Sequence, residues 1–201
     1  MKRKNRGILL IVTGLLLSFS AAVMFGAYEY QAEIAGDNAE LLLTNLRVEL
    51  QRDAVEQHIE TIREEVVGEI PKATLNGYAL IGELDIPTIG LELPVLDNWS
   101  YDLLQIAPCR YSGSIEGQNL ILLGHNYKRH FAPLKKLVSG DEVLFSAIDG
   151  TIYTFEVREI EILKKTQLEE LTSSDYDLTL FTCTNGGYSR HVIRCSLKNH
   201  F

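Results

Sequence analysis

The chain has 201 residues, 46% of them hydrophobic and 23% charged, which is enough for one domain with appendages but not for two full domains. The formal net charge of −8 is unevenly distributed. Four of the 19 basic residues lie within residues 1–6 and no acidic residue precedes Glu29, so the remainder carries 15 basic against 27 acidic side chains. Binding to nucleic-acid phosphates needs a basic surface, and this composition therefore excludes a nucleic-acid partner.

An uncharged stretch, residues 7–28, follows the basic N-terminus and is rich in Leu, Ile, Val and Ala. A helix needs roughly 20 apolar residues to cross a bilayer, and its basic flank stays in the cytoplasm. The pattern predicts a cytoplasmic tail at residues 1–6, a transmembrane signal-anchor at residues 7–28, and a single-pass protein of the cell membrane whose remainder is extracytoplasmic. The alternative is a cleaved signal peptide, whose apolar region usually has only about 7–15 residues.

Residues 29–70 are predicted to form an extracytoplasmic helical segment. Leu42, Leu46 and Leu50 recur every fourth residue, and the apolar stripe continues at helical spacing to about residue 67. The other positions are largely charged, which favours a helix that packs its stripe on the following domain. A free-standing stalk or a dimerising coiled coil is the alternative.

Residues 71–201 change character to short apolar runs separated by turn residues. The expected strands are Tyr78–Ile86, Ile89–Leu96, Asn119–Leu123, Glu142–Phe145, Thr151–Leu163, Asp177–Phe181 and His191–Leu197. Short helices are expected at Ser100–Ile106 and Phe131–Val138, and a loop with a helical turn at Lys164–Tyr176. Strands at such regular intervals with small helices between them predict a mainly-β barrel or sandwich.

The last two expected strands form a hairpin with a thiol at one end of its turn and a guanidinium at the other. Cys183 ends the first strand, a polar Gly-containing turn follows, and Arg190 opens the second strand. A hairpin brings these two side chains close together, and a nearby cation favours the nucleophilic thiolate. The pattern predicts a cysteine nucleophile that needs a histidine partner.

Of the five histidines, His125 is the best candidate for that partner, since it directly follows a strand that ends in glycine. His130 lies in the same loop and is its competitor. His191 points, by strand alternation, to the face opposite its arginine neighbour. His58 and His200 are expected to be solvated.

Three cysteines in an exported chain leave at least one thiol unpaired. Cys109 and Cys195 could form a disulfide and leave Cys183 free. Two buried free cysteines are the alternative.

The run TLFTC at residues 179–183 resembles the TLxTC signature of the sortases, the membrane-anchored cysteine transpeptidases of Gram-positive bacteria. The run LGHN at residues 123–126 is similar to that family's catalytic histidine strand, and Arg190 to the arginine that opens its last strand. The resemblance extends from about Gly77 to Leu197. It implies a closed β-barrel of about eight strands with short helices at residues 71–201.

The resemblance also implies a mechanism. Cys183 would attack an LPxTG-like sorting signal near the C-terminus of a secreted protein, His125 would act as acid and base, and Arg190 would hold the carbonyl or oxyanion. Thr182 and Asn126 would support the substrate or the oxyanion. The thioacyl-enzyme would be resolved by an amine of a peptidoglycan precursor or of a pilin lysine. No metal site or cofactor is expected; calcium, which activates some sortases, finds no clear acidic cluster here.

Arg194 is the alternative arginine. It lies on the same strand face as Arg190 but about 13 Å further along, at roughly 3.3 Å per residue, which is out of reach of Cys183.

The sortase class stays open. The helical segment and the LGHN run are similar to class B, but Lys164–Tyr176 is too short for the long helix that class B has there. Arg110 occupies the place of a further histidine found in some other classes. Two other functions remain: a hydrolytic cysteine peptidase on the same fold, and an inactive binding or scaffold domain, against which the complete set of three candidate side chains argues.

Overall fold

The computed structural model describes residues 2–57, 72–172, 175–184 and 186–200. The chain divides into two compact units, residues 1–34 and residues 35–201. A single helix, α1 (Lys2–Gln57), makes up the described part of the first unit and continues into the second.

No helix in the described part of the chain is both long enough and apolar enough to cross a membrane. The predicted signal-anchor at residues 7–28, and with it the single-pass location in the cell membrane, is wrong on this finding. That prediction rested on the absence of charge and on the Leu, Ile, Val and Ala content of the stretch. The limits drawn at residues 1–6 and 29–70 remain sequence predictions.

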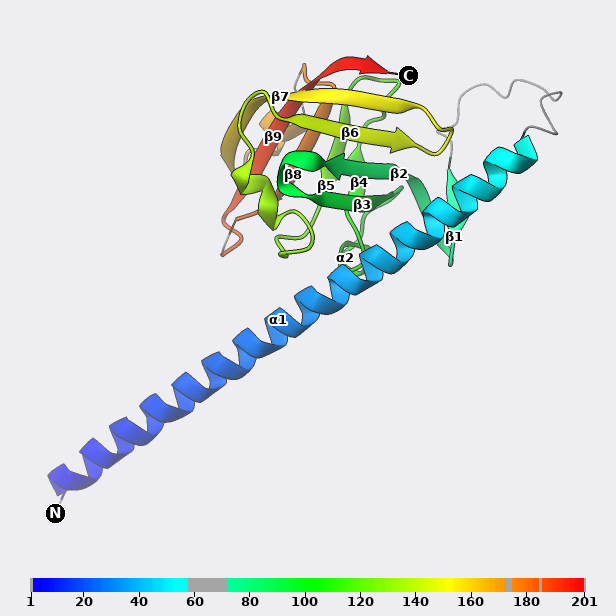
Figure 1. Ribbon diagram of the computed structural model, residues 1–201. Helices are drawn as coiled ribbons and strands as arrows, with labels where there is room; N and C mark the ends of the chain where they lie inside the picture. The colour runs from blue at the N-terminus through cyan, green and yellow to red at the C-terminus, as the bar shows by residue number, and fades with distance from the viewer. Residues whose placement is uncertain (1, 58–71, 173–174, 185, 201) are drawn as a thin grey trace. The chain divides into compact units, whose positions relative to one another are not determined.

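The described residues of the second unit contain nine strands that form a single sheet, and Figure 1 shows their arrangement. The strands are β1 (Ala73–Leu75), β2 (Tyr78–Ile86), β3 (Leu91–Leu96), β4 (Cys109–Ser112), β5 (Leu120–Leu123), β6 (Glu142–Ala147), β7 (Ile152–Lys164), β8 (Leu178–Cys183) and β9 (Ser189–His200). The order in the sheet is β1-β2-β3-β4-β5-β8-β9-β7-β6, and an additional β2–β6 pairing joins its ends. The ring β2 to β9 is a closed barrel of eight strands, which confirms the predicted fold.

In the described residues four short helical pieces lie beside the barrel, three where small helices were expected, whereas the one at Pro87–Ile89 was not predicted. They are η1 (Pro87–Ile89), α2 (Tyr101–Leu104), η2 (Ala132–Lys136) and α3 (Leu168–Thr172). Helix α2 begins where Ser100 accepts a hydrogen bond from the Leu103 amide, as an N-cap serine does. The shortness of α3 fits the expectation that no long helix precedes the final hairpin.

The barrel interior is filled by alternate side chains of every strand of the ring except β4, together with residues of η2. Leu178 and Leu180 of β8 point inward, as does Ile193 of β9, whereas Phe181 and Val192 pack in a separate cluster on the outer face. The two faces of the β8–β9 hairpin therefore meet different surroundings. This division matters for the candidate site, which lies at the hairpin's end.

Two strands, β1 and β4, were not predicted from the sequence. Strand β1 pairs with β2 through a turn at Asn76 and Gly77, with φ of 52° and 82°, the left-handed values that a two-residue type I′ hairpin turn requires. Strand β4 has four residues and a single paired position with β3, Leu96 to Cys109. Its apolar pattern is too short to be distinguished from a loop.

The described end of α1 packs on the barrel through the predicted leucine stripe. Leu42 and Leu46 are buried in one cluster with residues of β2, β3, β4 and α2. Arg47, one residue further, forms ion pairs with Glu83 and Glu92 of the barrel. A free-standing stalk is therefore wrong for this part of the helix, while the side chain of Leu50 and residues 58–71 lie outside what the structure describes.

We expect Leu46→Ala to lower the free energy of unfolding by about 2–5 kcal/mol, because it leaves a cavity at a fully buried position between helix and barrel. Leu41→Ala removes the same atoms from the same helix at a side chain that is 61% exposed, and should cost little. Urea unfolding of the full chain compares the two. Equal losses would contradict the packing of α1 on the barrel.

Candidate active site

Cys183 and Arg190 lie directly opposite each other at the turn end of the β8–β9 hairpin. The two residues are paired in the antiparallel register, and the neighbouring pair is Thr182 with His191. Directly opposed side chains of an antiparallel pair lie on one face with Cβ atoms about 4.5–5.5 Å apart. The predicted neighbourhood of thiol and guanidinium is thus present.

His125 reaches the same place from a different strand. Strand β5 runs parallel to β8 with Leu123 opposite Phe181, and the Gly124 amide donates to the Phe181 carbonyl at 3.1 Å. His125 lies two residues beyond that pair, just past the end of β5, and Cys183 lies two residues beyond it at the end of β8. Neighbouring strands are about 4.8 Å apart, so this register brings the backbones of the two residues to the same end of adjacent strands although 58 positions separate them in the sequence.

The turn that follows β5 depends on the glycine before His125. A Cβ at Gly124 would lie 2.6 Å from the ring of Phe131, which is completely buried. The Phe131 amide also donates to the His125 carbonyl at 3.0 Å. The chain therefore folds back tightly at this point, and the imidazole is held by a backbone that has little freedom.

Tyr127 stacks on His125, with ring centroids 4.6 Å apart and planes inclined by 28°. Both side chains lie largely out of water, and this burial lowers the pKa of His125 and raises the pKa of Tyr127. The imidazole is thus shifted toward its neutral form. The stacking of Tyr127 on His125 was not predicted from the sequence. The position of Tyr127 two residues after His125 was the signal that could have indicated that the two rings lie on the same side of the chain.

His130, the competing histidine, has a structural role. Its side chain is completely buried, and its Nε2 lies 3.2 Å from the Ala35 carbonyl of α1. Arg129 beside it forms ion pairs with Asp37 and Glu40 of the same helix. Helix α1 therefore braces the loop that carries His125, and His130 is excluded as the partner of the thiol.

The two candidate arginines differ in what already surrounds them. The Nη1 of Arg190 donates to the carbonyls of Gly187 and Ser189, both at 3.2 Å, and the guanidinium has no carboxylate partner among the described residues. These bonds hold it over the hairpin turn without neutralising its charge. It is the arginine that can meet a developing negative charge at Cys183.

Arg194, in contrast, is 2% exposed and fully engaged. It pairs with Glu161 at 2.8 Å and donates to the hydroxyl of Thr179 and to the backbone carbonyls of Glu170 and Leu171. It thereby fastens α3 to the barrel. The preference for Arg190 over Arg194 agrees with this geometry.

Arg110 likewise serves the fold. Its guanidinium forms an ion pair with the buried carboxylate of Asp97 and donates to the Asp97 and Gly113 carbonyls at 3.0 and 3.2 Å. Lys72 also contacts Asp97, at 3.0 Å. Arg110 therefore ties β4 to the end of β3 rather than reaching the thiol.

The three thiols are all free, so Cys109 and Cys195 do not form a disulfide. Both are completely buried, and burial raises the pKa of Cys109 to about 12 and that of Cys195 still further. Such thiols are inert. Cys183, which is only partly buried, is the accessible one.

Beside Cys183 lies a cavity of about 330 Å³. It includes both support residues predicted from the sequence, Thr182 and Asn126. The lining residues are Asn126, Ala132, Lys135, Ile162, Thr182, Cys183, Thr184 and His191. Lys135 and His191 were not anticipated here, because no pattern in the sequence shows that η2 covers the end of β8.

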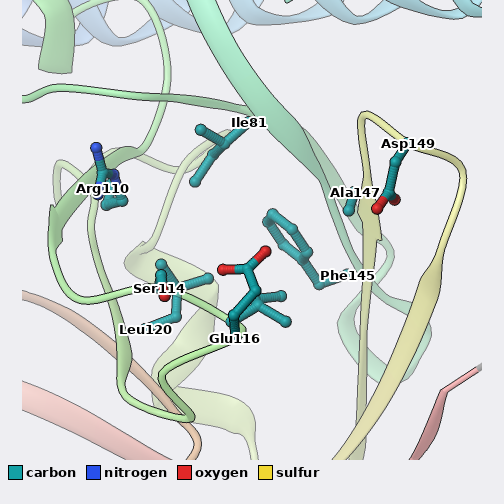
Figure 2. A pocket seen from close by; sticks show the side chains of 9 residues that line it. Ile81, Arg110, Ser114, Glu116, Leu120, Phe145, Ala147 and Asp149 are labelled. Atoms are coloured by element: carbon teal, nitrogen blue, oxygen red, sulfur yellow. The ribbon is translucent and has the colours of Figure 1, made fainter. Parts of the chain in front are cut away.

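A second, smaller hollow of about 20 Å³ lies between the β4–β5 loop and the β6–β7 turn (Figure 2). Glu116 and Asp149 border it together with Arg110, and it shares no residue with the cavity at Cys183. Among the described residues, no group of three or more His, Cys, Asp or Glu side chains is arranged to hold a metal ion.

A family model described as "Sortase domain" matches residues 84–198, more than half of the chain. The chain belongs to the sortase family. Sortases are cysteine transpeptidases that act on sorting-signal substrates, which makes this chain an enzyme of that kind. The matched region contains all five site residues predicted from the sequence.

Individual relatives are distant. Sortase A of Listeria monocytogenes is 23% identical over 193 residues, which cover 91% of this chain and 85% of that protein. A Clostridium perfringens sortase D5 transpeptidase has 20% identity and a TM-score of 0.57, covering 83% of this chain and 99% of that one. A C. perfringens sortase C solved with its C-terminal cell-wall sorting motif has 20% identity and a TM-score of 0.55, covering 78% and 89%. At these identities the structures confirm the shared fold.

The buried His130 makes stability depend on pH. Burial lowers the pKa of His130 to about 4, whereas an unfolded histidine has a pKa of about 6.5. Between these two values the unfolded chain binds a proton that the folded chain does not bind. The free energy of unfolding should therefore decrease as the pH is lowered through this range, by at most about 3 kcal/mol.

In His130→Gln, which keeps a donor for the Ala35 carbonyl, this component should disappear. Denaturant unfolding of both proteins at pH 7.5 and pH 4.5 measures it, and the carboxylates common to both cancel in the comparison. Identical pH dependence of the two proteins would show that His130 is not buried in its neutral form.

Proposed function

We propose that Cys183, His125 and Arg190 are the catalytic residues of this sortase and that residues 71–201 form its catalytic domain. The observation that carries the proposal is the double register of β8, which pairs with β9 on one side and with β5 on the other. We infer that this register brings the thiol of Cys183, the guanidinium of Arg190 and the imidazole of His125 together at the neighbouring ends of β8, β9 and β5. Arg194 and His130 are committed to other contacts.

The proposed reaction has two halves. The Cys183 sulfur attacks the carbonyl carbon of the scissile peptide bond, and the C–N bond breaks as His125 gives a proton to the leaving amine. A thioester between substrate and enzyme results. An acceptor amine then attacks the same carbon, its proton passes to His125, and the C–S bond breaks to release the Cys183 thiolate.

Arg190 is proposed to stabilise the oxyanion in both halves. Its Nη1 is held by the Gly187 and Ser189 carbonyls, so the guanidinium is already oriented when negative charge develops. Preorganised donors of this kind need no reorganisation during the reaction. Thr182 and Asn126 lie at the same end of the site and support the substrate there.

The sorting signal is proposed to lie along the outer face of β8. Phe181, two residues before Cys183, packs edge-on against Tyr111 at 5.2 Å, and Tyr111 contacts Trp99 at 5.7 Å. Trp99 is 40% exposed. Phe181 itself is 3% exposed, so Tyr111 and Trp99 are the members of this row that can offer contact area to apolar residues of an LPxTG-like motif. The similar C. perfringens sortase C solved with a sorting motif supports a substrate of this type.

The substrate is accordingly proposed to be a secreted protein with a C-terminal sorting signal. The acceptor is an amine of a peptidoglycan precursor or of a pilin lysine. The sequence and the fold are compatible with both acceptors.

Cys183→Ala should abolish cleavage of LPxTG-like peptides and the covalent acyl adduct that intact-protein mass spectrometry detects. Cys109→Ala and Cys195→Ala remove thiols that are completely buried and hold a high pKa, so each should retain both cleavage and adduct once its folding has been confirmed by circular dichroism. An adduct that persists in Cys183→Ala would refute the assignment of the nucleophile.

The two arginines should give opposite phenotypes. Arg190→Gln removes the oxyanion donor and should lower kcat by about 10²–10³-fold with little change in the free energy of unfolding. Arg194→Gln breaks a buried set of charged hydrogen bonds and should cost about 3 kcal/mol or more of stability. Peptide-cleavage kinetics and urea unfolding of both variants make the comparison. Loss of activity confined to a well-folded Arg194→Gln would reverse the roles.

A further inference from the structure

Three aromatic side chains of the loop after β5 form a row of contacts that ends on helix α1. The imidazole of His125 stacks on the ring of Tyr127, with centroids 4.6 Å apart. Tyr127 in turn contacts the imidazole of His130, with centroids 5.7 Å apart and planes inclined by 50°. The Nε2 of His130 lies 3.2 Å from the Ala35 carbonyl of α1. A continuous set of contacts therefore leads from the helix to His125.

The imidazole of His125 has a ring contact but no hydrogen bond within the part of the chain that the structure describes. Neither of its nitrogens is bonded to a side chain or a backbone group there. A histidine that transfers protons is usually oriented by a hydrogen bond at its second nitrogen. In this site the group that contacts the imidazole is the ring of Tyr127.

Tyr127 can hold the imidazole because its backbone and its ring are both fixed. Its carbonyl accepts hydrogen bonds from the amides of His130 at 3.0 Å and Ala132 at 3.1 Å. Its side chain is 8% exposed and contacts both imidazoles of the row. Aromatic pairs prefer definite separations and inclinations, so a fixed Tyr127 restricts the plane of the His125 ring.

The far end of the row is fixed by the close approach of α1. A Cβ at Gly36 would lie 2.3 Å from the Cδ and 2.8 Å from the Cβ of Arg129, so the glycine gives this side chain room to lie across the helix. The neighbouring Ala35 is 2% exposed. Buried contacts therefore hold His130 against the helix, and the exposed ion pairs of Arg129 add little to them.

We propose that Tyr127 is a positioning residue for His125. Its ring, supported by His130, keeps the imidazole in the orientation from which it gives a proton to the leaving amine and takes one from the acceptor. The inference rests on the proposed function, since His125 transfers these protons only if Cys183 forms a thioester. Tyr127 acts through the imidazole and not on the substrate, so its loss should affect the chemical step and spare binding.

Tyr127→Leu removes the ring but keeps an apolar side chain at this buried position. We expect kcat for cleavage of an LPxTG-like peptide to fall about 10- to 100-fold, the size that a misplaced catalytic group produces. KM should change by less than about twofold, because Tyr127 is not part of the surface proposed for the sorting signal. Tyr127→Phe keeps the ring and should recover most of the lost activity.

Tyr153→Leu is the matched control, because it removes the same atoms from another stacked pair, Tyr153 and Phe155, whose centroids are 6.4 Å apart. Tyr153 lies near the start of β7, ten residues before Leu163, which pairs with Arg190. Urea unfolding measures any loss of stability in both Leu variants, and only Tyr127→Leu should lower kcat. Equal kcat in the two, or a Tyr127→Phe as impaired as Tyr127→Leu, overturns the inference.

The second measurement needs no turnover. Burial lowers the pKa of His125 in the folded chain. Tyr127→Leu exposes a face of the imidazole to water, so this pKa should rise toward its ordinary value of about 6.5, whereas Tyr127→Phe should leave it lowered. NMR titration of the His125 ring protons in the resting full chain, identified by their absence in His125→Gln, measures both. A titration of Tyr127→Leu identical to that of the wild type contradicts the positioning role.

Formation of the thioacyl adduct separates this inference from the proposed function. If the wild-type chain forms the adduct at Cys183 and Tyr127→Leu forms it equally fast, the positioning role is refuted and the proposed function stands. If the wild-type chain forms no adduct, the proposed function is refuted whatever the titration of His125 shows, and the positioning role falls with it.

Discussion

The site depends on one strand that is paired on both sides. Strand β8 hydrogen-bonds to β9 in antiparallel register and to β5 in parallel register, so that the ends of all three strands coincide. A shift of one residue in either pairing would move every side chain of the strand to the other face. Cys183 could then meet neither His125 nor Arg190. The closure of the barrel through the β2–β6 pairing, which removes free edges, holds this register in place.

The imidazole depends on a second arrangement, the loop that leaves β5. The ring of Phe131 covers Gly124, and His130 and Arg129 bind helix α1 through the Ala35 carbonyl and two carboxylates. The stack of His125 on Tyr127 lies within this braced loop. Burial shifts His125 toward its neutral form, so a proton on it is weakly held, which suits the proposed role of giving a proton to the leaving amine and then recovering one.

The alternation of side chains along β8 gives Cys183, the proposed nucleophile, two neighbours of different character. Phe181 packs against Tyr111 on the outer face, and Thr182 lies on the opposite face beside the cavity. A transpeptidase must accommodate two substrates at one sulfur, an acyl donor and an amine. The end of a strand can present two different surfaces without any additional structural element, because successive side chains point to opposite sides.

The sequence by itself determined the β-rich barrel and the hairpin with Cys183 and Arg190, because period-two apolar runs, turn residues and the TLFTC run are local features. Its membrane anchor at residues 7–28, predicted from an uncharged stretch rich in Leu, Ile, Val and Ala, is wrong. Only the tertiary structure decided that His130 is buried against α1 and that Lys135 borders the thiol's cavity. Those contacts join segments far apart in the chain, and their geometry follows from strand register and helix docking, which leave no periodic signal in the sequence.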